Sequence, residues 1–158
     1  IQLARESGAQ VTALVRDASA SREVLSHLGA SDVIEDVVGD FDLVIDAVGG
    51  ATFGLAIEHV APRGIVVSIG TLNDDEAINF RAARFHRAKG ATIYTLNLFD
   101  ELAWHGGGTR DLDRLCRLNA AGRLDAQVEL EVSWHEAAAA LDALLTRRIG
   151  GKAVLNVD

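Results

Sequence analysis

The sequence predicts an α/β protein built on a doubly wound parallel sheet with helices on both faces. Short apolar runs alternate along the chain with stretches of helical periodicity, as repeated βαβ units require. The runs at residues 43–45 and 65–69 are apolar at successive positions, which indicates strands that are buried on both faces.

The first two thirds of the chain supply five predicted strands and the helices between them. Residues 1–8 have the pattern of the last turns of a helix that ends at Gly8, so we expect the chain to be part of a longer one. A second helix ends at Gly29, and a third occupies residues 51–60. Pro-Arg-Gly at residues 62–64 predicts a turn. The strands are expected within residues 11–15, 31–35, 43–45, 65–69 and 91–96.

The last third predicts a strand-helix-strand tail. A helix over residues 109–121 carries leucines on one face, and residues 127–132 alternate as a strand does. Ser133 and Glu136 have the spacing of a capping box at the start of the next helix. The final strand spans residues 153–157.

Composition excludes several classes of function. The chain has 15 Lys+Arg against 23 Asp+Glu, a net charge of −8, so we expect no nucleic-acid partner. One cysteine, Cys116, forms neither an internal disulfide nor a thiolate cluster. No apolar run approaches the ~18 residues of a membrane span, and no signal peptide heads the chain. We therefore expect a cytoplasmic protein without a membrane partner.

Arg16 is the sharpest candidate for ligand binding. Ligands of open parallel sheets bind beyond the carboxyl ends of the strands, and Arg16 follows the strand at residues 11–15. Dinucleotide-binding domains usually place an acid here for the adenosine ribose, whereas a cation pairs with the 2′-phosphate of NADP. Ser19 and Ser21 can add hydroxyl donors, while the neighbouring Asp17 can serve the ribose instead. A solvated surface arginine is the alternative; if a dinucleotide binds, we expect NADP rather than NAD.

Other catalytic constellations are absent from the sequence. The five histidines have no metal-ligand spacing, and Val66 two residues before Ser68 excludes a G-x-S-x-G elbow. Cys116 lies on the apolar face of a predicted helix, where a core role is favoured over a nucleophile. No G-x-G-x-x-G fingerprint is present, since the chain starts inside the helix that would follow it. We assign no catalytic residue and no metal ligand.

Six segments carry a resemblance to a known family: IQLARESGAQVTALVRD, HLGASDVI, FDLVIDAVGG, PRGIVVSIG, KGATIYTL and the closing run that starts with AAGRLDAQVELEVSWHEAAAALDALL. In order and spacing they resemble the medium-chain dehydrogenase/reductase superfamily. The branch that they resemble is that of the NADPH:quinone oxidoreductases and their zinc-containing alcohol dehydrogenase relatives.

The resemblance implies a Rossmann-like cofactor domain over residues 1–126, without its first strand and Gly-rich turn. Residues 127–158 would then return to a catalytic domain outside the chain. The loop from Leu98 would contact that domain or a second subunit, and the edge strand at residues 91–96 would pair with its copy in a homodimer. The site residues implied are Arg16, Ser19 and Ser21 at the adenosine phosphate, Ser68 and Gly70 beside the ribose and phosphates, and Tyr94, Leu96 and Asn97 at the nicotinamide.

The function implied is an NADPH-dependent oxidoreductase that passes hydride to a quinone, an enal or a similar unsaturated carbonyl. One alternative is a zinc-dependent alcohol dehydrogenase, whose catalytic zinc ligands come from the other domain in this family. Another is a non-catalytic dinucleotide-sensing or structural module, which binds nucleotide without turnover. A methyltransferase-like sheet is the remotest option, because the tail matches nothing of that class.

The resemblance also places the first strand of the fold between residues 11–15 and 43–47. Without that strand, the two flanking strands face a gap of unpaired backbone groups. We therefore expect the isolated chain to unfold below the ordinary domain range of ~45–65 °C, unless other residues supply the strand.

Overall fold

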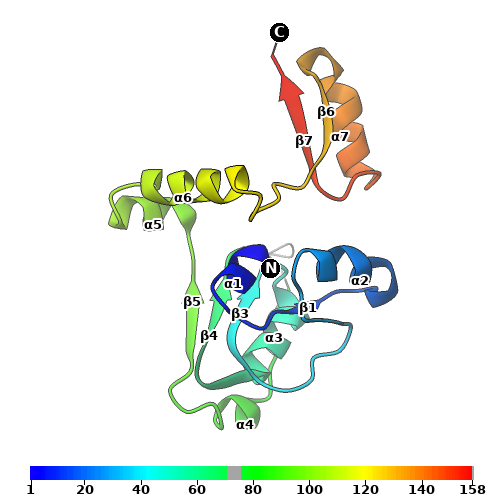
Figure 1. Ribbon diagram of the computed structural model, residues 1–158. Coiled ribbons are helices and arrows are strands. Elements are labelled where there is room, and N and C mark those ends of the chain that lie inside the picture. The colour runs from blue at the N-terminus through cyan, green and yellow to red at the C-terminus, as the bar shows by residue number, and fades with distance from the viewer. Residues whose placement is uncertain (71–75, 158) are drawn as a thin grey trace.

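The computed structural model describes residues 1–70 and 76–157. Helices and strands alternate along most of the chain, and Figure 1 shows their arrangement. In chain order they are α1 (Gln2–Glu6), β1 (Thr12–Leu14), α2 (Ala18–His27), β2 (Asp32–Ile34), β3 (Phe41–Asp46), α3 (Gly50–Glu58), β4 (Val60–Ser68), α4 (Ala82–Phe85), β5 (Thr92–Thr95), α5 (Leu98–Trp104), α6 (Thr109–Ala120), β6 (Val128–Ser133), the 3₁₀ turn η1 (Trp134–Glu136), α7 (Ala137–Leu145) and β7 (Lys152–Asn156).

Every strand pairing between described residues is parallel. β1 pairs with β2, β3 with β4 and β4 with β5, and β6 pairs with β7. A helix lies between the two strands of each of these four pairs, as crossovers between parallel strands require. The predicted α/β class with parallel strands is therefore confirmed, as is the strand-helix-strand tail, which Figure 1 shows apart from the β3–β4–β5 sheet.

The core lies between α3 and one face of the β3–β4–β5 sheet. Val66 in the central strand is completely buried, and Phe53 and Ile57 of α3 pack in the same cluster. Val44 of β3 packs against this cluster from the sheet side. The sheet is thus firmly covered on the side of α3.

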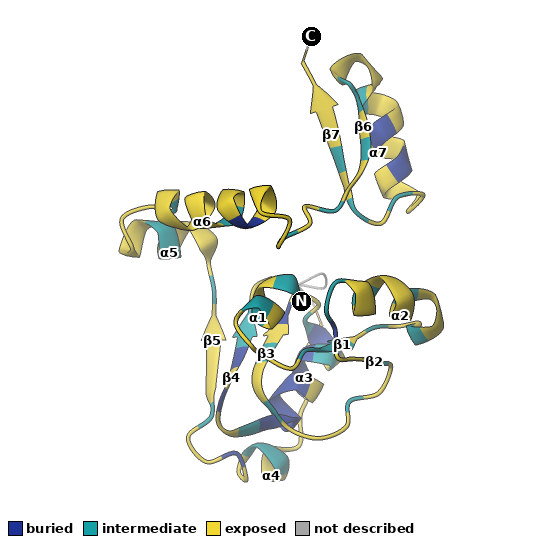
Figure 2. Ribbon diagram, in the orientation of Figure 1, coloured by how far each residue is buried: buried dark blue, intermediate teal, exposed yellow. Residues whose placement is uncertain are grey.

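The prediction that both faces of the strands are buried is wrong for the described residues. Side chains alternate along a strand, so Leu43 and Ile45 point away from the face that carries Val44. Leu43 is 55% and Ile45 60% exposed, and the yellow segments of Figure 2 show how much of β3 and β5 is open. The strands are apolar at successive positions as predicted, but the described residues cover only the face of the sheet that packs against α3.

The turn predicted at residues 62–64 is instead a bulge inside β4. Phe41 pairs with Val60 and Leu43 pairs with Ile65. Between these two pairs the chain moves two positions along β3 but five along β4, so the surplus residues of β4 bulge out of the ladder. Arg63 adopts a left-handed φ of 64°, and its N–H donates to the carbonyl of Lys89 at 3.0 Å. A proline in a central strand is tolerated at such an irregularity, because no ladder hydrogen bond is required of its nitrogen.

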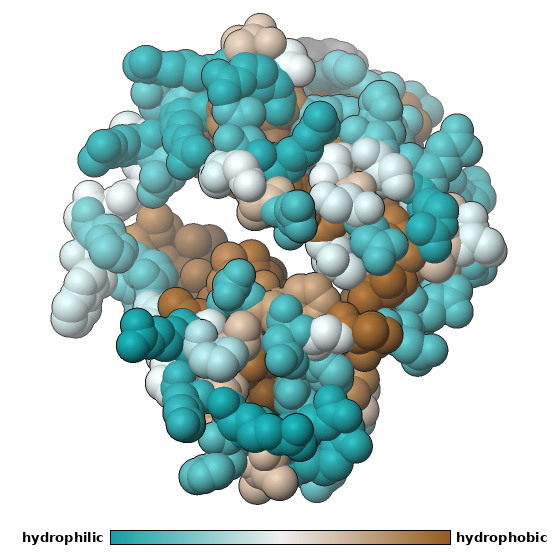
Figure 3. All heavy atoms as spheres, turned by 60° about the horizontal axis from the view of Figure 1, so that its bottom comes forward, coloured by the Kyte–Doolittle hydropathy of each residue, from teal (hydrophilic) through white to brown (hydrophobic). Residues whose placement is uncertain are grey.

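A central cleft separates β1 from β3, as expected for a sheet without its first strand. The cleft has a volume of about 350 Å³ and is lined by Thr12–Leu14 of β1, by Leu43–Val48 at and beyond β3, and by neighbours that include Ile34 and His59. Figure 3 shows hydrophobic side chains gathered around an opening through the molecule. The two strands belong to different sheets.

Smaller differences concern the helices. Residues 98–104 form helix α5 where a loop was expected. The hydroxyl of Ser133 accepts from the N–H of His135 at 3.4 Å and so caps η1, with α7 beginning only at Ala137. Within the described ranges, the structure contains no helix with both the length and the apolar character needed to cross a membrane.

Candidate functional site

Arg16 lies in the corner where β1 passes into α2. The N–H of Val15 still bonds to the carbonyl of Ile34 at 2.9 Å, so the ladder holds the backbone up to the residue before Arg16. The guanidinium is exposed, and the structure records no hydrogen bond or ion pair from it to another described residue. A cation with no recorded partner among the described residues therefore stands at the carboxyl end of β1.

Asp17 caps α2 and is engaged by its own helix. Its Oδ1 accepts from the N–H of Ala20 at 3.0 Å and from the hydroxyl of Ser19 at 2.7 Å. The Ser19 hydroxyl, and next the Ala20 amide, lower the pKa of Asp17 below its ordinary value. Because the Ser19 proton is directed at Asp17, a role for Ser19 toward a phosphate stays a prediction.

A second carboxylate also sits at the start of α2. Oε1 of Glu35 accepts from the N–H of Ala18 at 2.7 Å. Two of the free amides at this helix end are thus already bonded to carboxylates. The exposed side chain of Arg16 thus lies beside a helix start at which some of the N–H donors are already used. Ser21 is half-buried within α2.

The carboxyl ends of β4 and β5 bring Ser68 and Leu96 together. The carbonyl of Ser68 accepts from the N–H of Leu96 at 2.8 Å, and Ser68 pairs in register with Thr95. Gly70 lies just beyond β4, and apart from its chain neighbours no described residue has an atom within 4 Å of the place where a Cβ on Gly70 would stand. Among the described residues, none beyond the chain neighbours blocks the close approach of a ligand to this backbone.

Tyr94 and Asn97 are both bonded to α5. The Tyr94 phenol donates to Glu101, and this hydrogen bond, followed by burial, raises the pKa of Tyr94 above 10.0. Nε2 of His105 lies 3.4 Å from the same carboxylate. Asn97 caps the helix by accepting from the N–H of Phe99 at 3.0 Å.

Asp46 is a residue of this edge that sequence reasoning left without a partner. It is buried, and its Oδ2 accepts from the N–H groups of Val48 at 3.3 Å and Gly49 at 2.8 Å. Its carbonyl accepts from the N–H of Ile69 at 2.9 Å. Gly49 has φ 80°, a conformation that its lack of a Cβ permits. The Asp-to-Gly-Gly spacing at a strand end was the available signal.

The predicted site residues therefore fall into two groups. Arg16, Ser19 and Ser21 share the β1–α2 corner, whereas Ser68, Gly70, Tyr94, Leu96 and Asn97 share the β4–β5 edge. The structure records no hydrogen bond or ion pair between described residues of the two groups. The sheets that carry them are separated by the central cleft, which lies where the strand order reverses, the usual ligand position in such sheets.

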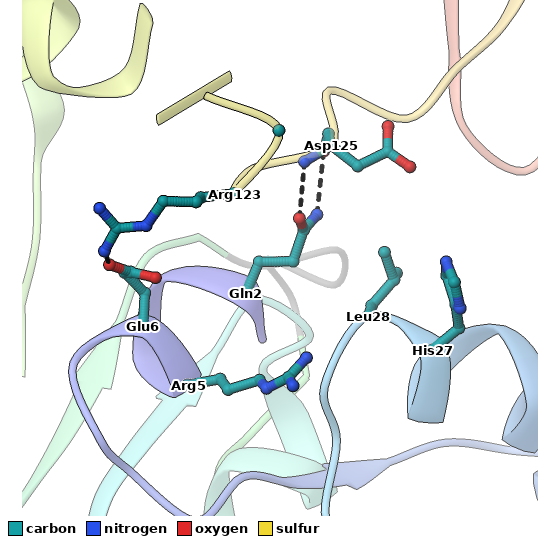
Figure 4. Close-up of a pocket in the computed structure, with 8 residues that line it drawn as sticks. Gln2, Arg5, Glu6, His27, Leu28, Arg123 and Asp125 are labelled. Carbon is teal, nitrogen blue, oxygen red and sulfur yellow. Dashed lines mark hydrogen bonds and ion pairs between the residues drawn. The ribbon is translucent and has the colours of Figure 1, made fainter. Parts of the chain in front are cut away.

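Two other features do not join this site. A cavity of about 500 Å³ lies between α1, the end of α2 and the segment after α6, and Figure 4 shows its lining. None of the predicted site residues lines it. In the part of the chain that the structure describes, no group of three or more His, Cys, Asp or Glu could hold a metal ion, so these residues do not fit a zinc site.

Comparison with solved structures finds the same fold. AibC is 26% identical, with a TM-score of 0.76 over 99% of this chain and 44% of its own. A mycobacterial quinone oxidoreductase is 20% identical, with a TM-score of 0.81 over 98% of this chain and 51% of its own. A mycobacterial protein solved in complex with NADPH is 19% identical, with a TM-score of 0.70 over 98% of this chain and 52% of its own. The chain thus spans about half the length of these structures.

A search of the curated proteins finds no match. The model of the family described as zinc-binding dehydrogenase matches residues 21–155, which is most of the chain. With parallel strands, helical crossovers and a cleft at the reversal of strand order, this match shows that the chain belongs to the zinc-binding dehydrogenase family.

Proposed function

We propose that the chain binds NADPH and that Arg16 recognises its 2′-phosphate. The observation that carries the proposal is the exposed guanidinium at the end of β1, beside an Asp17 carboxylate that is occupied as a helix cap. A planar cation with several donors suits a phosphate, whereas a ribose hydroxyl needs an acceptor. The mycobacterial relative solved with NADPH is consistent with this choice.

The β4–β5 edge would hold the other half of the cofactor in this proposal. Gly70 leaves open space for the ribose and phosphates, and Ser68 stands beside it at the end of β4. Leu96 would flank the nicotinamide, and the side chains of Tyr94 and Asn97 would orient this strand end through their bonds to α5. NADPH, when bound, supplies a hydride to an acceptor.

We propose a quinone, an enal or a similar unsaturated carbonyl as the acceptor of the complete protein. Support comes from the family and from the solved relative described as a quinone oxidoreductase. In this proposal residues 1–126 bind the cofactor, and residues 127–158 form part of the domain of the complete protein that binds the substrate. The open edge of β5, which is exposed along its length, would pair with a second copy. The cytoplasmic location stays a prediction.

Zinc-dependent alcohol dehydrogenase is the competing enzyme activity, and the family's description favours it. Since the described residues do not fit a zinc site, we derive no step through zinc. A dinucleotide-sensing module is the non-catalytic alternative.

One experiment separates these functions. The complete protein is titrated with NADPH and NADH, and NADPH absorbance is then followed with a panel of quinones, enals and simple alcohols or aldehydes. Tighter binding of NADPH, with consumption in the presence of quinones or enals, supports the proposal. Binding without consumption indicates a sensor, and turnover of alcohols that a chelator abolishes indicates the zinc enzyme. Absence of NADPH binding refutes the proposal.

A further inference from the structure

Two residues of α1 hold the chain segment that follows α6. Figure 4 shows the Gln2 amide reaching the backbone of Asp125, where it donates to the carbonyl at 2.9 Å and accepts from the N–H at 2.7 Å. One turn later on α1, Glu6 forms an ion pair with Arg123. We call these four residues the clasp.

Asp125 extends the clasp toward the C-terminal strands. Its carboxylate accepts from the backbone N–H of Gln127 at 2.8 Å and also from the Gln127 side chain. The carbonyl of Gln127 in turn accepts from the N–H of Lys152, the first residue of β7, at 2.7 Å. A continuous chain of hydrogen bonds thus runs from α1 through Asp125 to the start of β7.

The unit that this chain reaches, β6–α7–β7, is held together by its own strand pairing and by the packing of α7 on both strands. Ala140 and Ala143 of α7 are buried within the unit, and β6 pairs with β7 over its length. The unit stands apart from the β3–β4–β5 sheet in Figure 1. The pairing of β6 with β7 involves no clasp residue, whereas the clasp holds the segment that leads into the unit against α1.

The connecting segment has the backbone of a hinge. Gly122 has φ 68°, and Gln127 has φ 57°, a left-handed conformation that is uncommon for a residue with a side chain. Between them the polypeptide forms neither helix nor strand. Hinges are typically a few such residues at the ends of elements, where a φ/ψ change is absorbed.

We propose that the clasp of Gln2, Glu6, Arg123 and Asp125 fixes the orientation of β6–α7–β7, and that residues 122–127 are the hinge about which this unit turns when the clasp opens. The inference goes beyond nucleotide binding and does not depend on which dinucleotide binds. If the unit belongs with the substrate-binding part, the clasp sets how far the two parts of the protein stand open.

The test uses the complete protein with Gln2→Ala and Glu6→Gln combined. Thermolysin cuts before apolar residues such as Leu124 and Val128, and its rate follows the open population when opening is fast. Loss of two neutral hydrogen bonds and one exposed ion pair predicts roughly tenfold faster cleavage within residues 122–128. Mass spectrometry locates the cuts. Arg117→Gln, which removes the exposed pair with Asp113 on α6, is the matched control and leaves the rate unchanged.

Charge reversal gives a rescue that a general loss of stability cannot produce. Glu6→Arg and Arg123→Glu each accelerate cleavage, and the double variant restores a rate near that of the wild type. Spin labels at Ser26→Cys in α2 and Ala138→Cys in α7, in a Cys116→Ser background, give a broader distance distribution when the clasp is removed. Unchanged cleavage, or acceleration that is equally large within β3 and β4, overturns the proposal. Neither readout requires NADPH, so failure here is distinct from failure to bind the cofactor.

Discussion

Replacement of Arg16 by Gln tests the cofactor assignment directly. A hydrogen bond to a charged group contributes about 1.5–3 kcal/mol, and solvent around this exposed guanidinium favours the lower end. Since about 1.4 kcal/mol corresponds to a tenfold change in affinity, we expect NADPH binding to weaken about tenfold. NADH lacks the 2′-phosphate, so its affinity should stay within about twofold.

The assay is calorimetric titration of wild type and Arg16→Gln with NADPH, NADH and adenosine 2′-monophosphate, at low and at high salt. The difference between the two proteins should shrink with added salt, because an exposed charge pair is screened. Arg110→Gln, an exposed arginine on α6 with no recorded ion pair to a described residue, is the control. An unchanged ratio of NADPH to NADH affinity in Arg16→Gln refutes the reasoning.

Asp17→Asn sharpens the same test. Asparagine caps helices as well as aspartate does, so α2 should keep its start while the corner loses a negative charge. NADPH affinity should then rise modestly, and NADH affinity should stay the same. A large loss of NADH affinity would instead identify Asp17 as the ribose acceptor.

Three further predictions concern individual side chains. The Arg81 side chain, and then its backbone N–H, lower the pKa of Glu58 from 4.5 to about 2. The resulting stabilisation is complete above pH 4.5 and is lost as pH falls toward 2. In urea titrations, the free energy of unfolding of Glu58→Gln should therefore be clearly lower than that of wild type at pH 6, and much less so at pH 2. Tyr94 is the only tyrosine, so absorbance at 295 nm should report a lower phenol pKa in Glu101→Gln than in wild type. Val66→Ala, at a fully buried site, should lower the free energy of unfolding by about 1–3 kcal/mol, as measured by urea titration.

The positions of the strands, and the helices that connect them, could be predicted from the sequence because they depend on local apolar runs. Burial could not, since Ile45 and Val66 lie in equally apolar runs but differ from 60% exposed to completely buried. Which face of the sheet a helix covers depends on tertiary packing rather than on the amino-acid sequence of the strand. The turn predicted at Pro62 was wrong for a related reason, because the residue types that favour a turn also occur at bulges within a strand.

For the site, sequence order placed Arg16 at a strand end but could not show what its neighbours do. The capping role of Asp17 depends on a hydrogen bond to Ala20 that residue types alone leave open. Helix α5 could have been predicted from the sequence, because an asparagine cap at Asn97 followed by the acidic residues Asp100 and Glu101 is a common start of a helix. The backbone bonds of Asp46 needed the actual path of the loop.

The clasp has a consequence for the order of folding. Gln2 and Asp125 are 123 residues apart in sequence, and closing a flexible loop of that length costs roughly 4 kcal/mol in chain entropy. Two neutral hydrogen bonds return only about 1–3 kcal/mol, so this contact does not draw a disordered chain together. It forms once the intervening strands and helices have shortened the path between its ends. Native-state hydrogen exchange should accordingly find the Asp125 amide among the earliest to open.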